Sequence, residues 1–555
     1  MKTLNRHVSR VPGQAVALHQ ARPQFVLPPV LTLAGWVLGL GVMPAAMAAP
    51  EPAGHAGPHV TSPAPARSKP RLSIEGVTVL DAEALTRHWQ AAFDRPADAP
   101  TLDAIVRGVE DQVRAAGRPF ARVYVPKPVA GPGLAPQVVR IVVIEGHYGR
   151  VEFTGDAAER ARAWFEELQT GRPIGPELER QVQLVSQLPG VSATASLGPG
   201  EAVGEGAIGV VVQQARRWEG EIGVDNHGNR FSGQHRVVAA GHGNGLLIFG
   251  DRLSLSGSVN DGRGWQGALS YRIPFGKRGT QLSFSGGRHH YELGGEFKPL
   301  QAQGQVDSAG AQFVVPLVTG TKGRVAWQFG ADGRRIVSRH DAVAMRDRRQ
   351  SFSVTTGLQT VAYPTPGVVM WGGVSAEAGN LRLLDADARA FDAASARVAG
   401  EYLVLSSDVS LLSGWDRWSL LVRASGQMTD GNLDASRKFV LGGPRSVRAW
   451  PLGEASGDQG ALLQSELRYR VGTVEPFAFL DAGRVQFNHT LWPGAGAKRT
   501  GRGLAGAGVG VRWQMGGWQA EGMAGWRLAP EGKRQSTSDP SGKVPQLWLS
   551  ISYAL

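Results

Sequence analysis

The 555-residue sequence contains no cysteine, which excludes disulfide frameworks, thiolate nucleophiles and zinc sites with thiolate ligands. It also lacks a Gly-x-Ser-x-Gly elbow, a His-Glu-x-x-His motif and a Walker loop. A glycine-rich run at 501–510 superficially resembles a dinucleotide-binding loop, but it lies in a strand-rich region and no helix pattern follows it. No residue is therefore a candidate for catalysis, cofactor binding or metal binding, and we expect a protein that is not an enzyme.

Long hydrophobic runs are also missing, because no uninterrupted apolar run after residue 48 could cross a bilayer as a helix. If the mature chain enters a membrane, it must do so as strands. Residues 1–48 have the pattern of a secretory signal peptide: basic residues precede an apolar run at 25–43, and Ala-Met-Ala follows at 46–48. A membrane anchor is the alternative. Three prolines favour cleavage because they interrupt or end the run: Pro28, Pro29 and Pro44.

The net charge of +12 does not indicate a nucleic-acid partner, because the basic residues are dispersed along the chain. The composition is unusual in its 75 glycines, which follow no collagen period. Glycine in this amount suits many tight turns and closely packed strands better than helical bundles.

Two small units of the same kind follow a linker. Residues 49–70 are rich in Pro, Ala, Gly and His and show little periodicity, which indicates a linker. Residues 71–146 have patterns in the order β-α-α-β-β, and residues 147–216 repeat that order. The elements expected in the first unit are strand 72–80, helices 82–93 and 102–116, and strands 118–125 and 138–144. Those expected in the second unit are strand 149–153, helices 157–169 and 176–188, and strands 191–197 and 207–213.

Residues 217–555 alternate polar and apolar side chains with the period of a strand. In the segment 252–259, Leu253, Leu255, Gly257 and Val259 share one face, and an arginine and serines share the other. About sixteen such segments of roughly ten residues follow one another, joined by alternately short and long connections, as in bacterial outer-membrane barrels. The short connections are 276–279, 471–473 and 516–517, and the long ones are 292–306, 337–350, 379–400, 428–460 and 486–501.

The predicted fold is therefore two α+β periplasmic domains followed by an all-β transmembrane barrel of sixteen antiparallel strands. A closed barrel satisfies every backbone hydrogen bond without water, which a strand-built protein needs inside lipid. An even strand number places both ends of the barrel chain on the periplasmic side. We therefore expect an outer-membrane protein whose lipid-facing strands enclose a polar interior.

The paired units resemble POTRA (polypeptide-transport-associated) domains in their element order and in two phrases, Ile-Glu-Gly-Val at 74–77 and Gln-Leu-Pro-Gly-Val at 187–191. The last strand, 547–555, places an apolar or aromatic residue at every second position. It resembles the C-terminal signal read by the barrel-assembly machinery, with Tyr553 and Leu555 as the residues expected to carry it. That signal usually ends in Phe or Trp, whereas this chain ends in Leu.

Over residues 71–555 the chain resembles the two-partner secretion transporters, the TpsB family. With the predicted strand order, residues 428–460 form the sixth outer loop, and the family's loop motif Val-Arg-Gly-Tyr/Phe reads Val-Arg-Ala-Trp here. Further phrases of the likeness begin at Asp225, Gly250 and Gly506. The loop residues that carry the resemblance are Gly442, Gly443, Pro444, Arg445, Ser446, Val447, Arg448, Ala449 and Trp450.

The resemblance implies that Arg448 folds into the barrel and contacts Asp481, which lies in the strand motif Phe479-Leu480-Asp481-Ala482-Gly483. Strand alternation independently puts Phe479, Asp481 and Gly483 on one face. An arginine and a carboxylate form a charge-assisted contact of defined geometry that lysine would not reproduce. Taken without the resemblance, charge and spacing favour a solvated outer-loop position for Arg448 over the pairing.

The resemblance implies a transporter that exports a large unfolded exoprotein of hemolysin or adhesin type, with outer-membrane lipid and the barrel-assembly machinery as further partners. The POTRA-like units would capture the client by adding it to an exposed strand edge, for which strand 207–213 and its neighbours are candidates. The alternatives are an assembly factor of the same superfamily that folds other barrels, and a diffusion porin, which would not need the two units. The family's pore-plugging helix is not expected in 49–70, which holds too many prolines and glycines.

Overall fold

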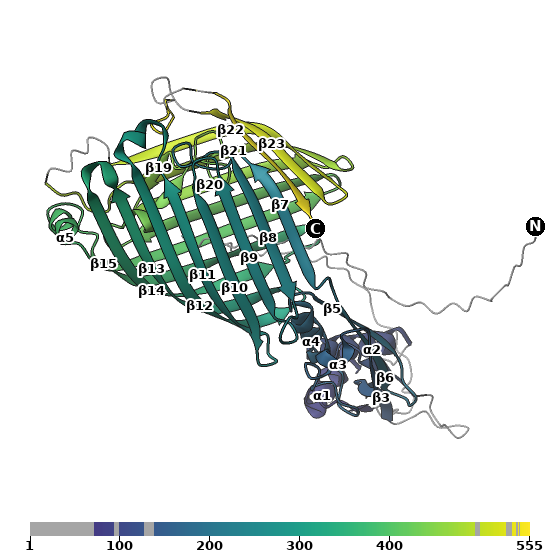
Figure 1. The fold of residues 1–555 in the computed structure, drawn as a ribbon. Helices are drawn as coiled ribbons and strands as arrows, with labels where there is room; N and C mark the ends of the chain where they lie inside the picture. The colour runs from purple at the N-terminus through teal and green to yellow at the C-terminus, as the bar shows by residue number, and fades with distance from the viewer. Residues whose placement is uncertain are drawn as a thin grey trace, which may run out of the picture.

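The computed structural model describes residues 71–93, 99–126, 138–493, 500–528, 535–539, 542 and 544–555. The expected signal peptide, 1–48, and the expected linker, 49–70, lie outside the described residues. In the described part of the chain, none of the helices has the length and apolar character that crossing a bilayer requires. Two small α/β units precede a large barrel (Figure 1).

The first unit has the predicted order β-α-α-β-β. It contains β1 (Arg71–Glu75), α1 (Ala82–Phe93), α2 (Ala99–Ala115), β2 (Arg122–Tyr124) and β3 (Val138–Ile144). The sheet order β1-β3-β2 puts β3 in the centre, and the helices bury their apolar faces against it. The first strand is shorter than predicted. It ends at Glu75, just before Gly76, where φ is +85° and a Cβ atom would lie 2.3 Å from the Val143 carbonyl oxygen.

The second unit repeats the arrangement with β4 (His147–Thr154), α3 (Ala158–Arg162), α4 (Glu177–Ser186), β5 (Val191–Pro199) and β6 (Glu205–Gln214). The helix predicted over 157–169 covers only 158–162. Beyond Arg162 the amides of Trp164 and Phe165 bond the carbonyls three residues earlier, at 2.7 and 3.0 Å, and this tighter turn directs both rings into the core.

The strand proposed as a docking edge is in the wrong place for that role. In the sheet order β4-β6-β5, β6 pairs with a strand on each side, so its backbone has no free edge. The open edges of this sheet belong to β4 and β5. Sequence alternation marked the 207–213 segment as a strand correctly but contained no information on its neighbours.

Sixteen antiparallel strands close into one barrel, as predicted. The first eleven are β7 (Trp218–Asp225), β8 (Arg236–Asn244), β9 (Arg252–Asn260), β10 (Trp265–Phe275), β11 (Thr280–Glu292), β12 (Ala302–Gly320), β13 (Gly323–His340), β14 (Met345–Ala362), β15 (Val368–Leu383), β16 (Gly400–Trp415) and β17 (Trp418–Thr429). The last five are β20 (Gln459–Tyr469), β21 (Val474–Gln486), β22 (Gly501–Met515), β23 (Trp518–Arg527) and β24 (Gln546–Ala554). β24 pairs with β7 to complete the cylinder.

Several strands are much longer than the predicted ten residues. β12, β13 and β14 have 18 or 19 residues each. The connection predicted over 337–350 is therefore mostly strand, and only 341–344, with the short helix η2 (Asp341–Val343), joins β13 to β14. The connections over 292–306 and 379–400 also shrink, to 293–301 with η1 (Gly295–Leu300) and to 384–399 with α5 (Ala386–Ala393). The three predicted short connections lie between strands as expected.

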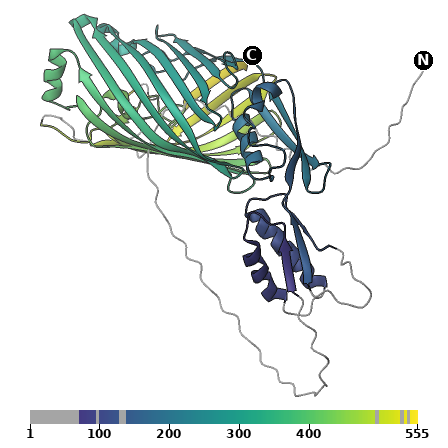
Figure 2. The same cartoon turned by 90° about the horizontal axis from the view of Figure 1, so that it is seen from below.

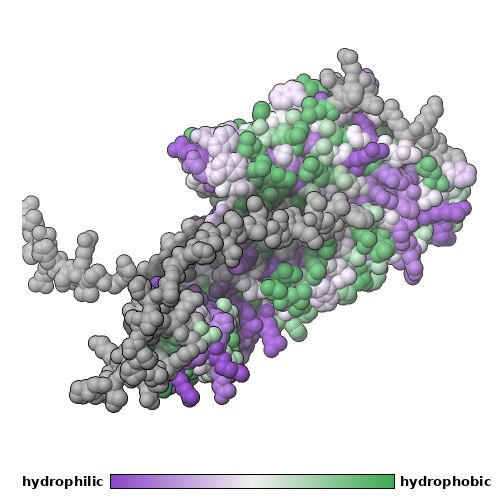
Figure 3. All heavy atoms as spheres, turned by 180° about the vertical axis from the view of Figure 1, so that it is seen from behind, coloured by the Kyte–Doolittle hydropathy of each residue, from purple (hydrophilic) through white to green (hydrophobic). Residues whose placement is uncertain are grey.

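The barrel has the expected apolar outer surface. Apolar residues form a broad belt between more hydrophilic ends in the space-filling view (Figure 3). In the last strand, Leu547, Leu549 and Ile551 are exposed on the outer face, whereas Trp548 between them is buried. This alternation is what a wall between lipid and a filled lumen requires.

The second α/β unit is docked on the barrel end that carries the short turns (Figure 2). Leu184 of α4 and Leu188, two residues beyond its end, lie against the turns at Gly279 and Gly250, where added Cβ atoms would meet them at 2.5 and 2.9 Å. Arg324 at the base of β13 donates to Gln187 at 2.9 Å. The first unit extends away from the barrel beyond the second.

Candidate functional site: a folded loop inside the barrel

The segment between β17 and β20, residues 430–458, is a folded loop. It contains a short helix, η3 (Ala435–Arg437), and a hairpin of β18 (Phe439–Leu441) and β19 (Ala455–Gly457). Eleven barrel strands precede it and five follow, as predicted. We call residues 430–458 the lumen loop, because its side chains contact the inward faces of the barrel strands. Its apolar residues pack with two wall residues, Val485 and Leu504, in one core: Phe439, Leu441, Val447, Ala449, Trp450 and Ala455.

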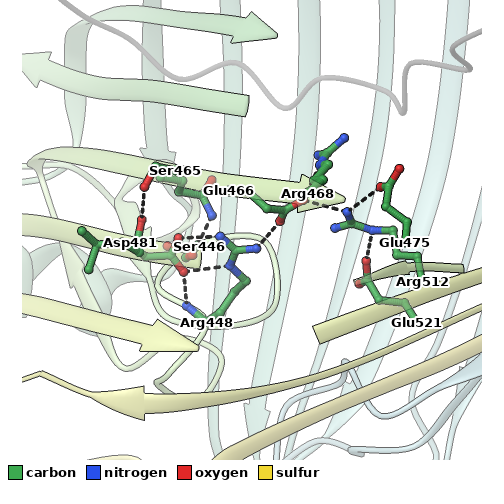
Figure 4. A network of polar contacts seen from close by, with 11 residues as sticks. Ser446, Arg448, Ser465, Glu466, Arg468, Glu475, Asp481, Arg512 and Glu521 are labelled. Atoms are coloured by element: carbon green, nitrogen blue, oxygen red, sulfur yellow. Dashed lines mark hydrogen bonds and ion pairs between the residues drawn. The ribbon is translucent and has the colours of Figure 1, made fainter. Parts of the chain in front are cut away.

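Arg448 and Asp481 are in direct contact (Figure 4). The Arg448 Nε donates to Asp481 Oδ2 and its Nη2 donates to Oδ1, both at 2.8 Å. The Arg448 backbone N–H also donates to Oδ2, at 3.0 Å. Asp481 is fully buried and Arg448 is 5% exposed. The paired geometry fixes both the position and the direction of the guanidinium group.

Asp481 faces the lumen because β21 alternates as predicted. Phe477, Phe479 and Asp481 are buried, whereas Ala478 and Leu480 are exposed on the lipid side. The Phe479 ring lies beneath the Arg448 guanidinium, with the carbon of the charged group 3.8 Å from the ring centre. This cation–π contact supports the planar guanidinium group from a second direction.

A second carboxylate, which the sequence analysis missed, shares Arg448. The Arg448 Nη1 donates to Glu466 Oε2, and Glu466 Oε1 accepts from Arg468 at 2.6 Å and from Arg512 at 2.7 Å. Glu466 therefore joins the loop arginine to two arginines of the wall. On β20, Leu463 and Leu467 are exposed on the lipid side, and Glu466 lies on the opposite face. Period-two analysis of this strand would therefore have placed Glu466 in the lumen.

Ala449 replaces the glycine of the family's loop motif, and the wall has room for its methyl group. A Cβ atom on Gly506 of β22 would lie 2.3 Å from the Ala449 Cβ, and one on Gly525 of β23 would lie 2.8 Å from the Ala449 Cα. Both wall glycines are therefore required for the loop to approach this closely. Two further glycines of β22, Gly508 and Gly510, similarly make space for phenylalanine rings of β21.

Trp450 replaces the tyrosine or phenylalanine of the motif. Its indole N–H donates to the Ala505 carbonyl at 2.9 Å, and the ring is almost fully buried. The guanidinium groups of Arg527 and Arg502 lie 4.8 and 5.4 Å from its ring centre. From the last strand, Trp548 donates to the Arg448 carbonyl at 2.8 Å. The loop tip is thus held by β20 to β24 together.

The other predicted loop residues shape the turn that presents Arg448. Gly442 and Gly443 have φ values of +96° and +102°, which only glycine adopts without strain. Ser446 accepts a hydrogen bond from the Gly442 amide at 3.3 Å, and its carbonyl accepts one from Gln464 at 2.8 Å. Pro444 and Arg445 line a cavity of about 170 Å³ that also contacts Arg448 and Glu466.

Three predicted residues lie on the barrel wall. A Cβ on Gly483 would meet a Leu441 methyl at 2.7 Å, so this glycine admits the loop hairpin. Tyr553 packs its ring on Trp518 at 4.9 Å, and the exposed Leu555 donates its amide to Gly220 at 2.8 Å. The last two residues therefore lie in the seam that closes the barrel rather than near the lumen loop.

A second arginine anchors the base of the lumen loop to another part of the wall, which β16 and β17 separate from β20 and β21. Arg437 donates to Glu377 of β15 at 3.2 Å, to Asp332 of β13 at 3.2 Å and to Ser353 of β14 at 3.0 Å. Its side chain is 11% exposed. The loop is therefore tied by one arginine to β20 and β21 and by another to β13, β14 and β15. Because these partners come from distant strands, the sequence had no local signal for the second contact.

The family relationship is decided by a match over residues 204–513 to the model described as "Haemolysin secretion/activation protein ShlB/FhaC/HecB". The chain belongs to this family, the TpsB transporters. The match covers the end of the second α/β unit and most of the barrel, including the lumen loop and Asp481. TpsB proteins are transporters of the outer membrane and not enzymes, with POTRA domains on the periplasmic side and a secreted exoprotein as partner.

Curated relatives agree with this TpsB assignment. The chain is similar to two proteins named "Heme/hemopexin transporter protein HuxB" from Haemophilus influenzae, one from strain 86-028NP, 25% identical over 338 residues, and one from strain KW20/Rd, 26% identical over 339 residues. Each match covers 60% of this chain and 60% of the relative. The chain thus spans about three-fifths of the length of the curated relatives it matches.

Solved structures show the same fold. The structure titled "CdiB from Escherichia coli" aligns with a TM-score of 0.70 and 18% identity over 88% of this chain and 90% of that one. The structure titled "CdiB from Acinetobacter baumannii" aligns with a TM-score of 0.64 and 16% identity over 89% and 91%. The barrel and the preceding POTRA-like units therefore follow an arrangement already seen in solved proteins.

Proposed function

We propose that this TpsB protein exports an unfolded partner exoprotein of hemolysin or adhesin type from the periplasm to the cell surface, through the barrel. The lumen loop is the observation that carries the proposal. In its docked position it is fixed to two separate parts of the wall by arginine–carboxylate contacts, so passage of a client requires the loop to shift or to stay at one side. Export would use no nucleotide, since the sequence contains no Walker loop.

The second candidate is an assembly factor of the same superfamily that inserts other barrels. In the part of the chain that the structure describes, two POTRA-like units precede the barrel, and so short an array favours secretion. Hemopexin-related cargo is one choice of client, because the HuxB relatives carry heme and hemopexin in their names. Co-expression with a candidate large exoprotein, followed by assay of the medium, distinguishes the two functions. A secretion transporter would release the exoprotein into the medium. An assembly factor would instead change the amounts of other outer-membrane barrels.

The loop anchor is tested by three single variants, Arg448→Ala, Arg448→Lys and Asp481→Asn. Each is expected to abolish export, because removing one partner of a buried pair costs about 3–5 kcal/mol, and lysine cannot make the two parallel bonds. The matched control is Arg484→Gln, because Arg484 is exposed on the lipid side of β21. Heat-modifiable migration in gels checks that every variant is a folded barrel. Normal export by the Arg448 and Asp481 variants would remove the loop from the mechanism.

Client capture is proposed to use the open edge of β5. The Ala193 backbone N–H donates to the Ser186 hydroxyl of α4 at 3.2 Å, and its C=O accepts from the same hydroxyl at 3.0 Å. The backbone N–H and C=O groups of odd-numbered β5 residues therefore point away from β6. Ala195 and Leu197 continue this edge beyond α4 and are exposed. An extended client segment could pair with them through its backbone, which requires little sequence recognition.

Ala195→Pro and Leu197→Pro test that edge. Each removes one outward N–H, so client binding to the full-length protein is expected to weaken severalfold, with β5 still paired to β6. The control is the exposed Thr194→Ala on the same strand, which retains every backbone donor. Binding is measured with a peptide from the client's N-terminal region. If the proline variants bind the peptide as tightly as the wild type, the β5 edge does not capture the client, and the two POTRA-like units act only as spacers.

A further inference from the structure

A row of polar side chains crosses the outer wall of the barrel near the end that carries α5. Five residues on consecutive strands occupy one register row: Arg288, Asp307, Arg335, Gln350 and Arg382. They face outward, because the alternate residues Asp332 and Ser353 on the same strands contact the lumen loop. Figure 1 shows β12 to β15 running from the α/β units towards α5.

The row borders a cavity of about 680 Å³ in the outer surface. The polar side is lined by Asp307, Arg335, Gln350 and Arg382. One row closer to the periplasm, the lining changes to Ala309, Gly333 and Phe352, and the Phe352 ring is 58% exposed. The small residues leave space beside the ring. The cavity thus has a cationic side and an apolar side.

The charges of this row are not balanced within the protein. Asp307 accepts hydrogen bonds from Arg288 and Gln305, so its carboxylate is already used. Arg335 lies opposite Asp307 and feels its charge, but among the described residues no hydrogen bond or close ion pair to a carboxylate is found for Arg335 or Arg382, and both are exposed. Two further arginines, Arg339 and Arg346, are register neighbours on β13 and β14 and are also exposed. The carboxylate that interacts electrostatically with Arg346, Asp385, is already hydrogen-bonded to Arg348. Like charges directly opposite on neighbouring strands repel, unless an anion lies between them.

The height of the row along the barrel matches a headgroup region. A tilted strand needs about 9–11 residues to cross the hydrocarbon layer. Counted from the start of β13 at Gly323, that length ends near Gly333, so Arg335 is the first outward side chain beyond it. On the periplasmic side of the row, the outward residues Phe329 and Trp327 of the same strand are exposed and apolar. The arginines therefore lie where the polar headgroups of the outer leaflet begin.

We propose that this arginine cluster, Arg335, Arg339, Arg346 and Arg382, binds the phosphorylated headgroup of an outer-leaflet lipid, with an acyl chain against Phe352. Guanidinium groups match phosphate geometry through paired hydrogen bonds. The apolar side of the cavity favours a lipid over a free anion, because a soluble phosphate would leave the exposed ring unused. The site lies on the lipid side of the wall, so it is separate from the lumen loop and from the export pathway.

The test uses the full-length protein in detergent and two probes, lipid A with its two phosphates and the same lipid after removal of the phosphates. Native mass spectrometry gives the fraction of protein that retains each lipid during titration. The wild-type protein is expected to retain the phosphorylated lipid preferentially. The double variant Arg335→Gln/Arg382→Gln should bind it about 25-fold more weakly, because each basic group near an anionic surface contributes about a fivefold factor.

Arg484→Gln is the matched control, since Arg484 also faces outward but has Ala461 and Gly503 as register neighbours and so belongs to no polar row. Its retention of lipid should equal that of the wild type. Equal binding of both lipids by the wild type, or unchanged binding by the double variant, would overturn the proposal. Competition with inorganic pyrophosphate separates a lipid site from a site for soluble anions. Displacement of the lipid by pyrophosphate at equal concentration would also overturn the proposal. Heat-modifiable migration confirms that each variant is folded, and no export is needed for the readout.

Discussion

Ala449 shows how one side chain of the lumen loop depends on two wall residues that have none. Its methyl group occupies the space left by Gly506, and its backbone passes close to Gly525. The family's loop motif has glycine at this position, so the methyl group of Ala449 adds contact with the wall. The wall leaves no space here for a larger side chain. The fit is thus set by the sum of the volumes at positions 449 and 506.

Gly506→Ala is expected to weaken docking of the lumen loop, because the new Cβ would lie 2.3 Å from that of Ala449. Overpacking of this kind costs about 1–3 kcal/mol. The double variant Gly506→Ala/Ala449→Gly should restore docking, since it exchanges the positions of the methyl group and the hydrogen. Docking is measured by protease cleavage of the loop in intact cells.

Gly503→Ala is the control on the same strand. An added Cβ there has its nearest neighbour, the Gly483 carbonyl oxygen, at 3.8 Å, which is ordinary contact. Cleavage should therefore stay at the wild-type level. If the double variant is cleaved as fast as Gly506→Ala alone, the two positions do not share one space and the packing argument is wrong.

The sequence predicted one side-chain contact of the lumen loop and missed two others. Arg448 and Asp481 were predicted to meet, and the structure brings them together with the expected paired geometry. Glu466 was missed although strand alternation could have placed it in the lumen. Arg437 was missed for a different reason: Asp332 precedes it by 105 residues, and only barrel closure brings the two together.

Within the first α/β unit, Glu145 connects three elements at the end of β3. Its carboxylate accepts hydrogen bonds from the Thr78 amide and hydroxyl, each at 2.5 Å, from the Val79 amide at 3.0 Å and from Arg118 at 3.0 Å. Burial by itself would raise the pKa of Glu145, but these hydrogen bonds outweigh it and lower the pKa below the ordinary value of 4.5. The charged form is thus the one that the fold stabilises.

Glu145→Gln is expected to destabilise this unit by about 1–3 kcal/mol, because the amide cannot accept all four bonds. For the wild type, a lowered pKa means that the stabilisation is complete at neutral pH and is lost as the pH falls below about 4.5 towards the lowered value. Hydrogen exchange of β1 and α2 in the full protein, corrected for the intrinsic pH dependence of exchange, measures both effects.

Glu75→Gln provides the comparison, because the Glu75–Arg140 pair is exposed and such pairs contribute little to stability. Exchange in β1 should change far less than in Glu145→Gln. Equal effects of the two substitutions would show that Glu145 acts as an ordinary surface charge and that the buried hydrogen bonds do not stabilise the unit.

Strand length was the main error at the scale of elements. The loops predicted over 292–306 and 337–350 include residues of β12, β13 and β14, because these strands continue well beyond the thickness of a membrane. The extensions contain many charged residues, which single-sequence reasoning assigns to loops. In the barrel, each extended strand has its backbone satisfied by its neighbours, so the polar sequence stays in the sheet.

The whole molecule holds its lumen loop by two anchors on separate parts of the wall, Arg448 at the tip and Arg437 at the base. Neither anchor involves neighbouring residues in sequence. A loop tied at both places cannot swing about either one alone, so release from the docked position requires both sets of contacts to break. The two-anchor arrangement predicts that loss of either arginine makes the pore less tightly closed.

Arg437→Gln is expected to raise the frequency of open events in planar-bilayer recordings, because it leaves the partly buried carboxylates of Glu377 and Asp332 without their arginine. Arg437→Gln/Arg448→Gln should exceed either single variant. Arg484→Gln, on the lipid side, serves as the control. A conductance of Arg437→Gln equal to that of the wild type would show that the tip anchor alone holds the loop.

The sequence by itself determined the architecture, because period-two patterns, glycine turns and a repeated β-α-α-β-β order are local signals that physics connects directly to strands, helices and their faces. It also identified Arg448 and Asp481 through short motifs. Only the tertiary structure decided which strand edges stay open, which carboxylates share an arginine and which outward charges form one row. These depend on the register between strands that lie far apart in the chain, and barrel closure alone sets that register.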